Sequence, residues 1–291
     1  MADRHEYIIF NTAACLPFNI KRHQLLIMIH NILKDKATRL FIVLSGILIA
    51  NAMVAEFMGV KIFSLEETLG WKPVNILLFG DAYSFNLTCG VLLWPVVFVM
   101  TDIINEYYGR KGVRFISWLA AILISYSFIM LFGAMKTAPN SWWVTSKVPA
   151  GIENMNTAYN GIFGQGLGII VASMSAFLIG QLIDVYVFRG IKKRTGEKHI
   201  WLRATGSTLV SQFIDSFVVL VIAFYFYPKW VANQGSPWPL NQIIAIGIVN
   251  YIYKFCVAIL LTPVIYLVHG WIERYLGHEK AAEMKNAAMG K

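Results

Sequence analysis

Six runs of about 20 apolar residues constrain this chain most, because each is long enough to cross a bilayer as a helix. They cover residues 40–59, 85–101, 113–135, 164–186, 205–227 and 243–268, and the second is short unless it also takes in residues 77–79. Hydrophobic residues make up 57% of the 291 and charged residues 14%, against roughly 45–50% and 25% in a soluble domain. We therefore predict an all-α integral membrane protein with six transmembrane helices.

The basic residues predict how these helices are oriented. The segments up to residue 39, at 107–114, at 189–203 and after 268 hold 19 of the 25 Lys and Arg residues, whereas the alternate connections hold five. Because basic residues accumulate on the cytoplasmic side, both termini should lie in the cytoplasm, with the protein in the inner membrane. The net charge of +9 is then explained by topology, and we expect no nucleic acid partner.

Three regions follow from this organisation. Residues 1–38 are predicted to be a cytoplasmic extension, in which residues 23–37 have the spacing of a helix lying on the membrane surface. Residues 39–270 form the membrane domain, and residues 271–291 a cytoplasmic tail. Five tryptophans in the outward connections predict an aromatic belt or, alternatively, rings at the mouth of a pocket; they are Trp71, Trp142, Trp143, Trp230 and Trp238.

Several ionisable side chains lie inside the apolar runs, where each costs roughly 2.5–3.5 kcal/mol to insert at the bilayer centre. They are Glu56, Asp102, Glu106, Asp184, Asp215 and Lys254. We interpret Glu56 and Glu106 as residues near an interface that reach water. The others are candidates for a functional site.

Helical spacing groups polar residues into stripes on separate spans. The stripe members are Asn51 in the first run, Ser173, Gln181 and Asp184 in the fourth, Thr208, Ser211, Gln212, Asp215 and Ser216 in the fifth, and Gly247, Asn250, Tyr251 and Lys254 in the sixth. Not all of these stripes can face lipid, so they should turn toward one shared interior.

Lys254 is expected to form an ion pair with Asp184 or Asp215. One lysine cannot neutralise both aspartates and Asp102, so at least one carboxylate needs another partner, a proton or a ligand. The motif Q-[LF]-I-D occurs twice, at Gln181–Asp184 and Gln212–Asp215. Its glutamines can either contact a ligand or simply hydrogen-bond between helices.

This set of residue types suits a flat heterocycle. A carboxylate accepts two parallel N–H bonds from an amino-pyrimidinone edge, amides read adjacent carbonyl or ring nitrogen atoms, and aromatic rings stack on the faces. Another small polar solute would also be compatible with these residues.

Four ordered blocks of sequence resemble the queuosine precursor transporters, also called the vitamin uptake transporter family. The blocks are Thr101-Asp102-Ile103-Ile104-Asn105-Glu106-Tyr107-Tyr108-Gly109, Ile179-Gly180-Gln181-Leu182-Ile183-Asp184-Val185-Tyr186-Val187-Phe188, Ser207-Thr208-Leu209 leading into Gln212 and Asp215, and Asn250-Tyr251-Ile252-Tyr253-Lys254. The resemblance covers residues 39–267, and the first 38 residues look like an extension.

The resemblance implies import of deazaguanine-type bases, precursors of the tRNA nucleoside queuosine. It also implies a six-helix fold similar to the substrate-binding components of energy-coupling-factor transporters. Carried over residue by residue, the substrate-binding positions are Asn51, Asp102, Gln181, Asp184, Gln212, Asp215, Asn250, Tyr251 and Lys254. No catalytic residue, metal or cofactor is expected, and the oligomeric state is open, with a homodimer as one alternative.

Two other functions fit the sequence less well. An intramembrane aspartyl protease would use two aspartates on neighbouring spans, but the Tyr-Asp and Gly-x-Gly-Asp contexts typical of such enzymes are missing here. The chain could instead be a vitamin- or nucleobase-binding subunit that depends on an ATPase module. It has no Walker A pattern of its own, so it should not hydrolyse nucleotide.

Overall fold

The computed structural model describes residues 34–164, 167–195, 200–230 and 236–289. The chain divides into two compact units, Met1–Leu44 and Ser45–Lys291, and every predicted site residue belongs to the second. The surface helix predicted at residues 23–37 falls outside the described residues except for its last four positions. The domain boundaries predicted for the two ends of the chain stay predictions.

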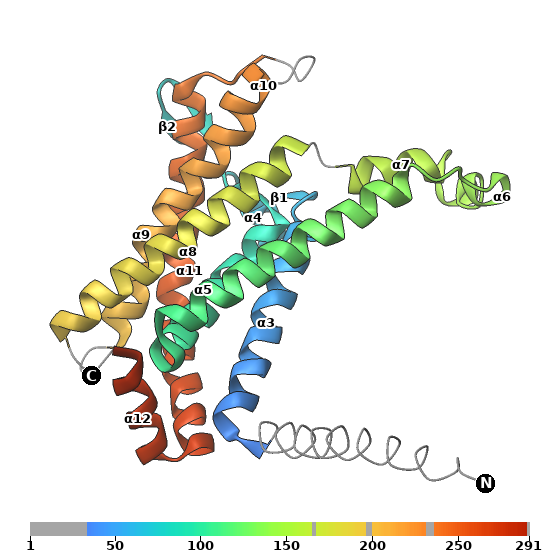
Figure 1. The fold of residues 1–291 in the computed structure, drawn as a ribbon. Coiled ribbons are helices and arrows are strands. Elements are labelled where there is room, and N and C mark those ends of the chain that lie inside the picture. The colour runs from blue at the N-terminus through green and yellow to red at the C-terminus, as the bar shows by residue number, and fades with distance from the viewer. Residues whose placement is uncertain (1–33, 165–166, 196–199, 231–235, 290–291) are drawn as a thin grey trace, which may run out of the picture. The chain divides into compact units, whose positions relative to one another are not determined.

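Helices account for most of the described residues (Figure 1). They are α3 (Lys36–Met58), α4 (Leu65–Thr68), α5 (Trp94–Met135), α6 (Ser141–Val144), α7 (Met155–Phe163), α8 (Leu167–Thr195), α9 (Ile200–Val221), α10 (Tyr227–Trp230), α11 (Leu240–Leu276) and α12 (His278–Met289), with the shorter turns η1 (Cys89–Leu92), η2 (Val148–Ala150) and the π-helical η3 (Ile222–Phe226). Helix α8 packs mainly against α9, α9 also packs against α11, and α12 packs against α5.

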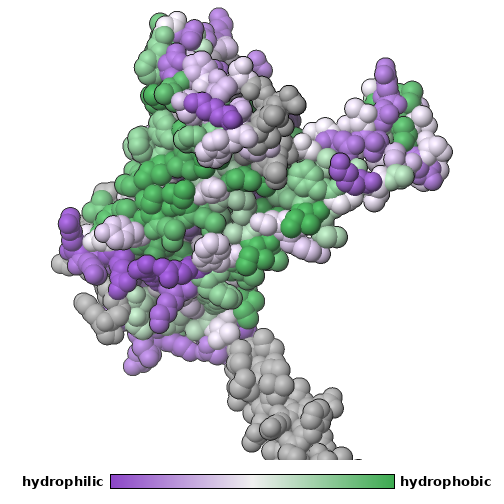
Figure 2. Space-filling view, turned by 45° about the horizontal axis from the view of Figure 1, so that its top comes forward, coloured by the Kyte–Doolittle hydropathy of each residue, from purple (hydrophilic) through white to green (hydrophobic). Residues whose placement is uncertain are grey.

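Five described segments are long and apolar enough to span a membrane. They are Lys36–Met58, Cys89–Met135, Ile169–Thr195, Thr205–Trp230 and Leu240–Leu276. Figure 2 shows hydrophobic side chains across the middle of the surface and hydrophilic side chains above and below them. The all-α membrane class is confirmed, while the count of six spans stays a prediction because the second and third predicted spans both fall within Cys89–Met135.

Helix α5 contains a sharp turn at Gly109, which has φ 65° and ψ −172°. The hydroxyls of Thr101 and Ser117, 16 residues apart, both donate to Gln181 Oε1, over 2.9 and 3.4 Å. A continuous helix would separate those two residues by about 24 Å, so the chain must fold back between them. We call residues 94–108 the first limb and residues 110–135 the second limb of α5.

Glycine is needed at this turn for two reasons. A positive φ of this kind strains any residue with a Cβ. In addition, a Cβ at position 109 would lie 3.1 Å from the carbonyl oxygen of Ala288 and 3.2 Å from its Cα. The last turn of α12 therefore rests directly on the backbone of the α5 turn.

Polar contacts link α12 to the end of α11 and link both of these helices to α5. Lys285 Nζ lies 2.6 Å from Glu273 Oε1, and the Tyr107 hydroxyl lies 3.0 Å from His269 Nδ1. Lys285 also lies over the Tyr107 ring, 5.5 Å from its centroid. The segment predicted as a tail thus contributes an ordered helix to the fold.

Four short strands connect α3 to α5: β1 (Ile62–Ser64), β2 (Ile76–Leu78), β3 (Asp81–Tyr83) and β4 (Asn86–Thr88). Strand β1 pairs with β4 and β2 with β3, both antiparallel. Phe79 and Gly80 both have positive φ, as the two-residue turn of a tight hairpin requires. The prediction that the second span begins at residue 85 is wrong, because residues 86–88 pair as a strand before the helical segment that starts at Cys89.

Candidate functional site

A cavity of about 410 Å³ is lined mainly by α3, η1, α8, α9, η3 and α11, with single residues from β1, β4, α5 and α7. We call it the central cavity. Its lining includes charged, polar and aromatic side chains, among them Glu56, Trp94, Ser173, Asp215, Asn250 and Lys254. Its size lies within the range of pockets that enclose small organic ligands.

An ion pair forms one wall of the central cavity. Lys254 Nζ on α11 lies 2.5 Å from Asp215 Oδ2 on α9. Of the two partners expected for Lys254, the structure therefore has Asp215. The lysine side chain is 7% exposed and the aspartate 16%, and both residues line the cavity.

Two close helix contacts position this pair. A Cβ on Gly247, two turns before Lys254 on α11, would lie 2.6 Å from the Phe217 ring of α9. A Cβ on Gly180 of α8 would lie 3.7 Å from Asp215 Cβ. Small residues at both positions allow α8, α9 and α11 to approach closely around Asp215.

Glu56 supplies a second carboxyl group to the central cavity. It is 5% exposed and accepts a hydrogen bond from the hydroxyl of Ser173. The interpretation that Glu56 reaches water at an interface is wrong. Glu56 instead lies in the protein interior, where α8 provides it with a donor.

The interpretation that Glu106 reaches water at an interface is wrong as well. Its side chain is 1% exposed and lies 3.0 Å from Lys192 Nζ. Lys192 is itself buried because α8 continues to Thr195, nine residues beyond the end of the predicted span. The charge therefore has a partner inside the protein and need not reach solvent.

Aromatic rings border the central cavity on two sides. Trp94, at the start of α5, lies 5.4 Å from the buried Phe177 ring. Phe224, in the π-helical turn η3, also lines the cavity and stacks on Trp238 with ring centroids 3.9 Å apart. Such π-helical turns are common at functional sites.

Asp102 and Asp184 lie outside the central cavity in a buried hydroxyl-rich network. Asp102 accepts hydrogen bonds from Ser207 (3.2 Å) and Thr208 (2.9 Å), and Asp184 accepts one from Ser211 (3.3 Å). Over the described part of the chain, no Lys or Arg nitrogen lies within 4 Å of either carboxylate. Asp184 Oδ2 is buried and has no hydrogen-bond partner among the described residues, so hydroxyl donors satisfy this pair of carboxylates only in part.

The two glutamines of the repeated motif have different surroundings. Gln181 accepts from Thr101 and Ser117 and so links α8 to both limbs of α5. Gln212 is 1% exposed, and neither of its amide atoms has a hydrogen-bond partner among the described residues. Gln212 borders a small hollow that also reaches Lys254.

The remaining predicted residues divide between the cavity and other surfaces. Asn250 lines the central cavity and donates from Nδ2 to the carbonyl of Ile246. Asn51 donates to the carbonyl of Ile47 one turn earlier and does not line the cavity. The Tyr251 ring packs edge-on against Phe213, so α11 directs it away from the polar interior.

The structure thus gathers Asp215, Asn250 and Lys254 at the central cavity and places Asp102, Gln181, Asp184 and Gln212 in the buried layer beside it. Glu56 and Trp94 also line the central cavity, although neither was among the predicted substrate-binding residues. The signal for Glu56 was its position in an apolar run. Trp94 gave no usable signal, because it is one apolar residue within the predicted span 85–101. Within the described ranges, no cluster of three or more His, Cys, Asp or Glu side chains is arranged to hold a metal ion.

Comparison with known proteins places this arrangement in a family. The sequence model described as "Putative vitamin uptake transporter" matches residues 88–268. A relative from Bacillus subtilis (strain 168), named "Probable queuosine precursor transporter", is 29% identical over 188 residues, which is 64% of this chain and 73% of the relative. The "Queuosine precursor transporter" of Escherichia coli (strain K12) is 28% identical over 190 residues, 64% of this chain and 72% of that protein.

No solved structure was found to match the chain, so its likeness to the binding components of energy-coupling-factor transporters stays a prediction. The family match covers more than half of the chain. It includes both limbs of α5, all of α8 and α9, and Lys254. This chain is a multi-pass membrane protein that belongs to the vitamin uptake transporter family.

Proposed function

We propose that this chain imports a deazaguanine-type queuosine precursor base across the inner membrane, with the central cavity as the substrate site. The observation that carries the proposal is the combination of two carboxyl groups, one ammonium group, an amide and aromatic rings around 410 Å³. The names of the relatives agree with a substrate of this kind. No catalytic role is proposed for any residue.

The cavity chemistry matches the edges of such a base. Lys254 occupies Oδ2 of Asp215, which leaves Oδ1 to accept an N–H from the amino-pyrimidinone edge. Glu56 offers a second acceptor, while Asn250 can donate to or accept from a ring carbonyl or nitrogen. The Trp94 and Phe224 rings can pack against the flat faces. Asp102, Asp184, Gln181 and Gln212 then act as the layer that fixes α8 and α9 behind the site.

A ligand-stabilisation screen tests the substrate class. Purified full-length protein is heated with deazaguanine bases, guanine or vitamins, and the shift in unfolding temperature is measured. We expect a shift with deazaguanine bases that is lost in Asp215→Asn and kept in Arg194→Gln, a control on the exposed end of α8. A vitamin that stabilises the protein while the bases do not would refute the proposed substrate.

Transport itself is tested in a precursor-starved strain that lacks its own importer. Expression of this chain should restore queuosine-modified tRNA at low external base. Restoration by the chain alone indicates a solitary carrier, as we propose. Restoration only when an energy-coupling ATPase module is co-expressed would make it a dependent subunit.

We also propose that both termini face the cytoplasm, on the strength of the basic-residue distribution. A reporter fused after Lys291 should be active only in its cytoplasm-dependent form. Activity of the periplasmic form there would refute the orientation. We expect no nucleic acid partner, and we propose a homodimer as an alternative to a monomer, to be decided by the mass of the detergent-solubilised protein.

A further inference from the structure

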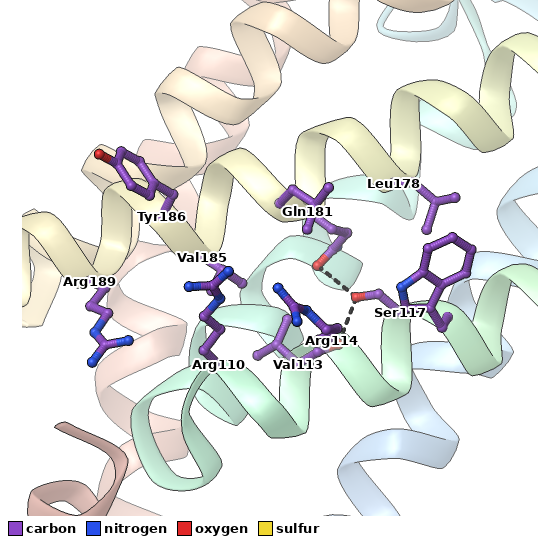
Figure 3. A pocket seen from close by; sticks show the side chains of 11 residues that line it. Arg110, Val113, Arg114, Ser117, Leu178, Gln181, Val185, Tyr186 and Arg189 are labelled. Atoms are coloured by element: carbon purple, nitrogen blue, oxygen red, sulfur yellow. Dashed lines mark hydrogen bonds between the residues drawn. The ribbon is translucent and has the colours of Figure 1, made fainter. Parts of the chain in front are cut away.

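A second hollow of about 170 Å³ lies between the second limb of α5 and α8 (Figure 3). It shares no residue with the central cavity. We call it the α5–α8 groove. We propose that it binds one anionic glycerophospholipid, with the phosphate at its basic end and an acyl chain at its apolar end.

The groove is strongly polarised along its length. The two helices run in opposite directions across it, so that Arg110 and Arg114 of α5 lie toward the same end as Arg189 of α8 (Figure 3). The other end is lined by Leu178 and by Trp118. A phospholipid has the same order of chemistry from its phosphate to its hydrocarbon chain.

No carboxylate of the described chain neutralises the basic end of the groove. Arg110, Arg114 and Arg189 are all exposed, and along the described chain none of them forms an ion pair with a carboxylate. No acidic side chain lines the groove. Three guanidinium groups without an internal counter-ion, placed where apolar helices end, favour a phosphate from the surrounding bilayer.

Gln181 adds a polar side chain between the two ends. It is 2% exposed and lines the groove. Its Oε1 accepts from Ser117 and Thr101, whereas its Nε2 has no hydrogen-bond partner within the described residues. Gln181 precedes Arg189 by eight residues, about 12 Å along α8, and so lies between the basic and the apolar ends of the groove.

The outer side of the groove faces the bilayer rather than the interior. Tyr186 is 81% exposed and Trp118 and Leu182 are each 55% exposed. Large apolar and aromatic side chains that are this exposed suit contact with acyl chains. The groove is therefore reached laterally from the leaflet on the Gly109 side, which the basic-residue distribution assigns to the cytoplasm.

Native mass spectrometry and thermal unfolding of the purified full-length protein test the proposal. The probes are phosphatidylglycerol, phosphatidylcholine with the same acyl chains, and sn-glycerol 3-phosphate. We expect phosphatidylglycerol to remain bound and to raise the unfolding temperature, with little effect of the other two. Equal binding of phosphatidylcholine would refute the role of charge, and equal binding of glycerol 3-phosphate would refute a lipid in favour of a free anion.

Variants assign the binding to the groove. The triple variant Arg110→Gln/Arg114→Gln/Arg189→Gln should bind phosphatidylglycerol on the order of tenfold more weakly or worse. Arg194→Gln, which removes an exposed arginine of the same helix outside the groove, should bind like the wild type. Loss of binding in both variants to the same degree would show a general effect of net charge and would overturn the proposal.

Leu178→Trp tests the apolar end independently. The larger ring should fill the groove where the acyl chain lies and reduce phosphatidylglycerol binding while all three arginines remain. Unchanged lipid binding in this variant would contradict the assigned position of the chain. The lipid test does not depend on base transport, because lipid binding can be measured in a protein that fails to bind bases.

Discussion

Two buried lysine–carboxylate pairs hold this bundle together, and they differ in what surrounds them. Lys192 and Glu106 are 5% and 1% exposed, and Lys192 donates both to the carboxylate and to the backbone carbonyl of Glu106. Lys254 and Asp215 are 7% and 16% exposed and line the central cavity. The first pair has the properties of a structural link between α5 and α8, whereas the second leaves an acceptor free for a ligand.

The largest effect on stability is expected from Lys192→Met. The substitution leaves the Glu106 carboxylate buried without its cation, which costs about 3–5 kcal/mol in the free energy of unfolding. Chemical unfolding in detergent measures the change. Lys193→Met, at the exposed neighbouring position, is the control, and equal stability of the two variants would contradict the structural role.

Lys254→Met should separate stability from binding. The stranded Asp215 can be hydrated from the cavity, so the loss of stability should be smaller than for Lys192→Met. Stabilisation by deazaguanine bases should be abolished. Thermal unfolding with and without base measures both effects, and a Lys254→Met protein that binds base normally would remove this pair from the site.

Gly247→Ala should disturb the geometry of the second pair without changing a charge. The new Cβ would lie 2.6 Å from the Phe217 ring, and overpacking of this kind costs about 1–3 kcal/mol. Gly270→Ala on the same helix has no atom within 4 Å of its Cβ and should be neutral or stabilise by up to about 1 kcal/mol. Identical unfolding midpoints for the two variants would show that the α9–α11 contact is looser than described.

The smallest effect is expected from Ser173→Ala. It removes one hydroxyl donor from Glu56, and cavity water can replace that donor, so the cost should be about 1 kcal/mol or less. Ser127→Ala, whose hydroxyl only bonds to the carbonyl of Leu123, is the matched control. A large loss of stability in Ser173→Ala alone would show that the Glu56 end of the cavity is dry.

Helical periodicity predicted the interior face of α9 well. Thr208, Ser211, Gln212 and Ser216 of the predicted stripe are all buried. The same method assigned Tyr251 to the polar face of α11, but its ring packs on Phe213. The four positions of the predicted α11 stripe span a wide arc of the helix surface. A residue at the edge of that arc, such as Tyr251, can contact a different helix from the residues at its centre.

Other features depend on tertiary packing and could not be predicted from local patterns. The burial of Lys192 requires α8 to continue past its apolar run and α5 to turn at Gly109, which brings Glu106 to it. The central cavity is a space left unfilled between elements that are far apart in the sequence. Glu56 and Trp94 belong to the candidate site only because of that gap.

The turn at Gly109 also has a consequence for how the protein is made. The first limb carries Asp102 and Glu106 into the membrane long before their partners exist, since Thr208 and Lys192 lie 106 and 86 residues later. At a synthesis rate of about 5–20 residues per second, these carboxylates wait roughly 4–20 s for α8 and α9 to emerge. During that time the hairpin of α5 has to keep its acidic end near water or within the insertion machinery, and full entry into the bilayer becomes a late step of assembly.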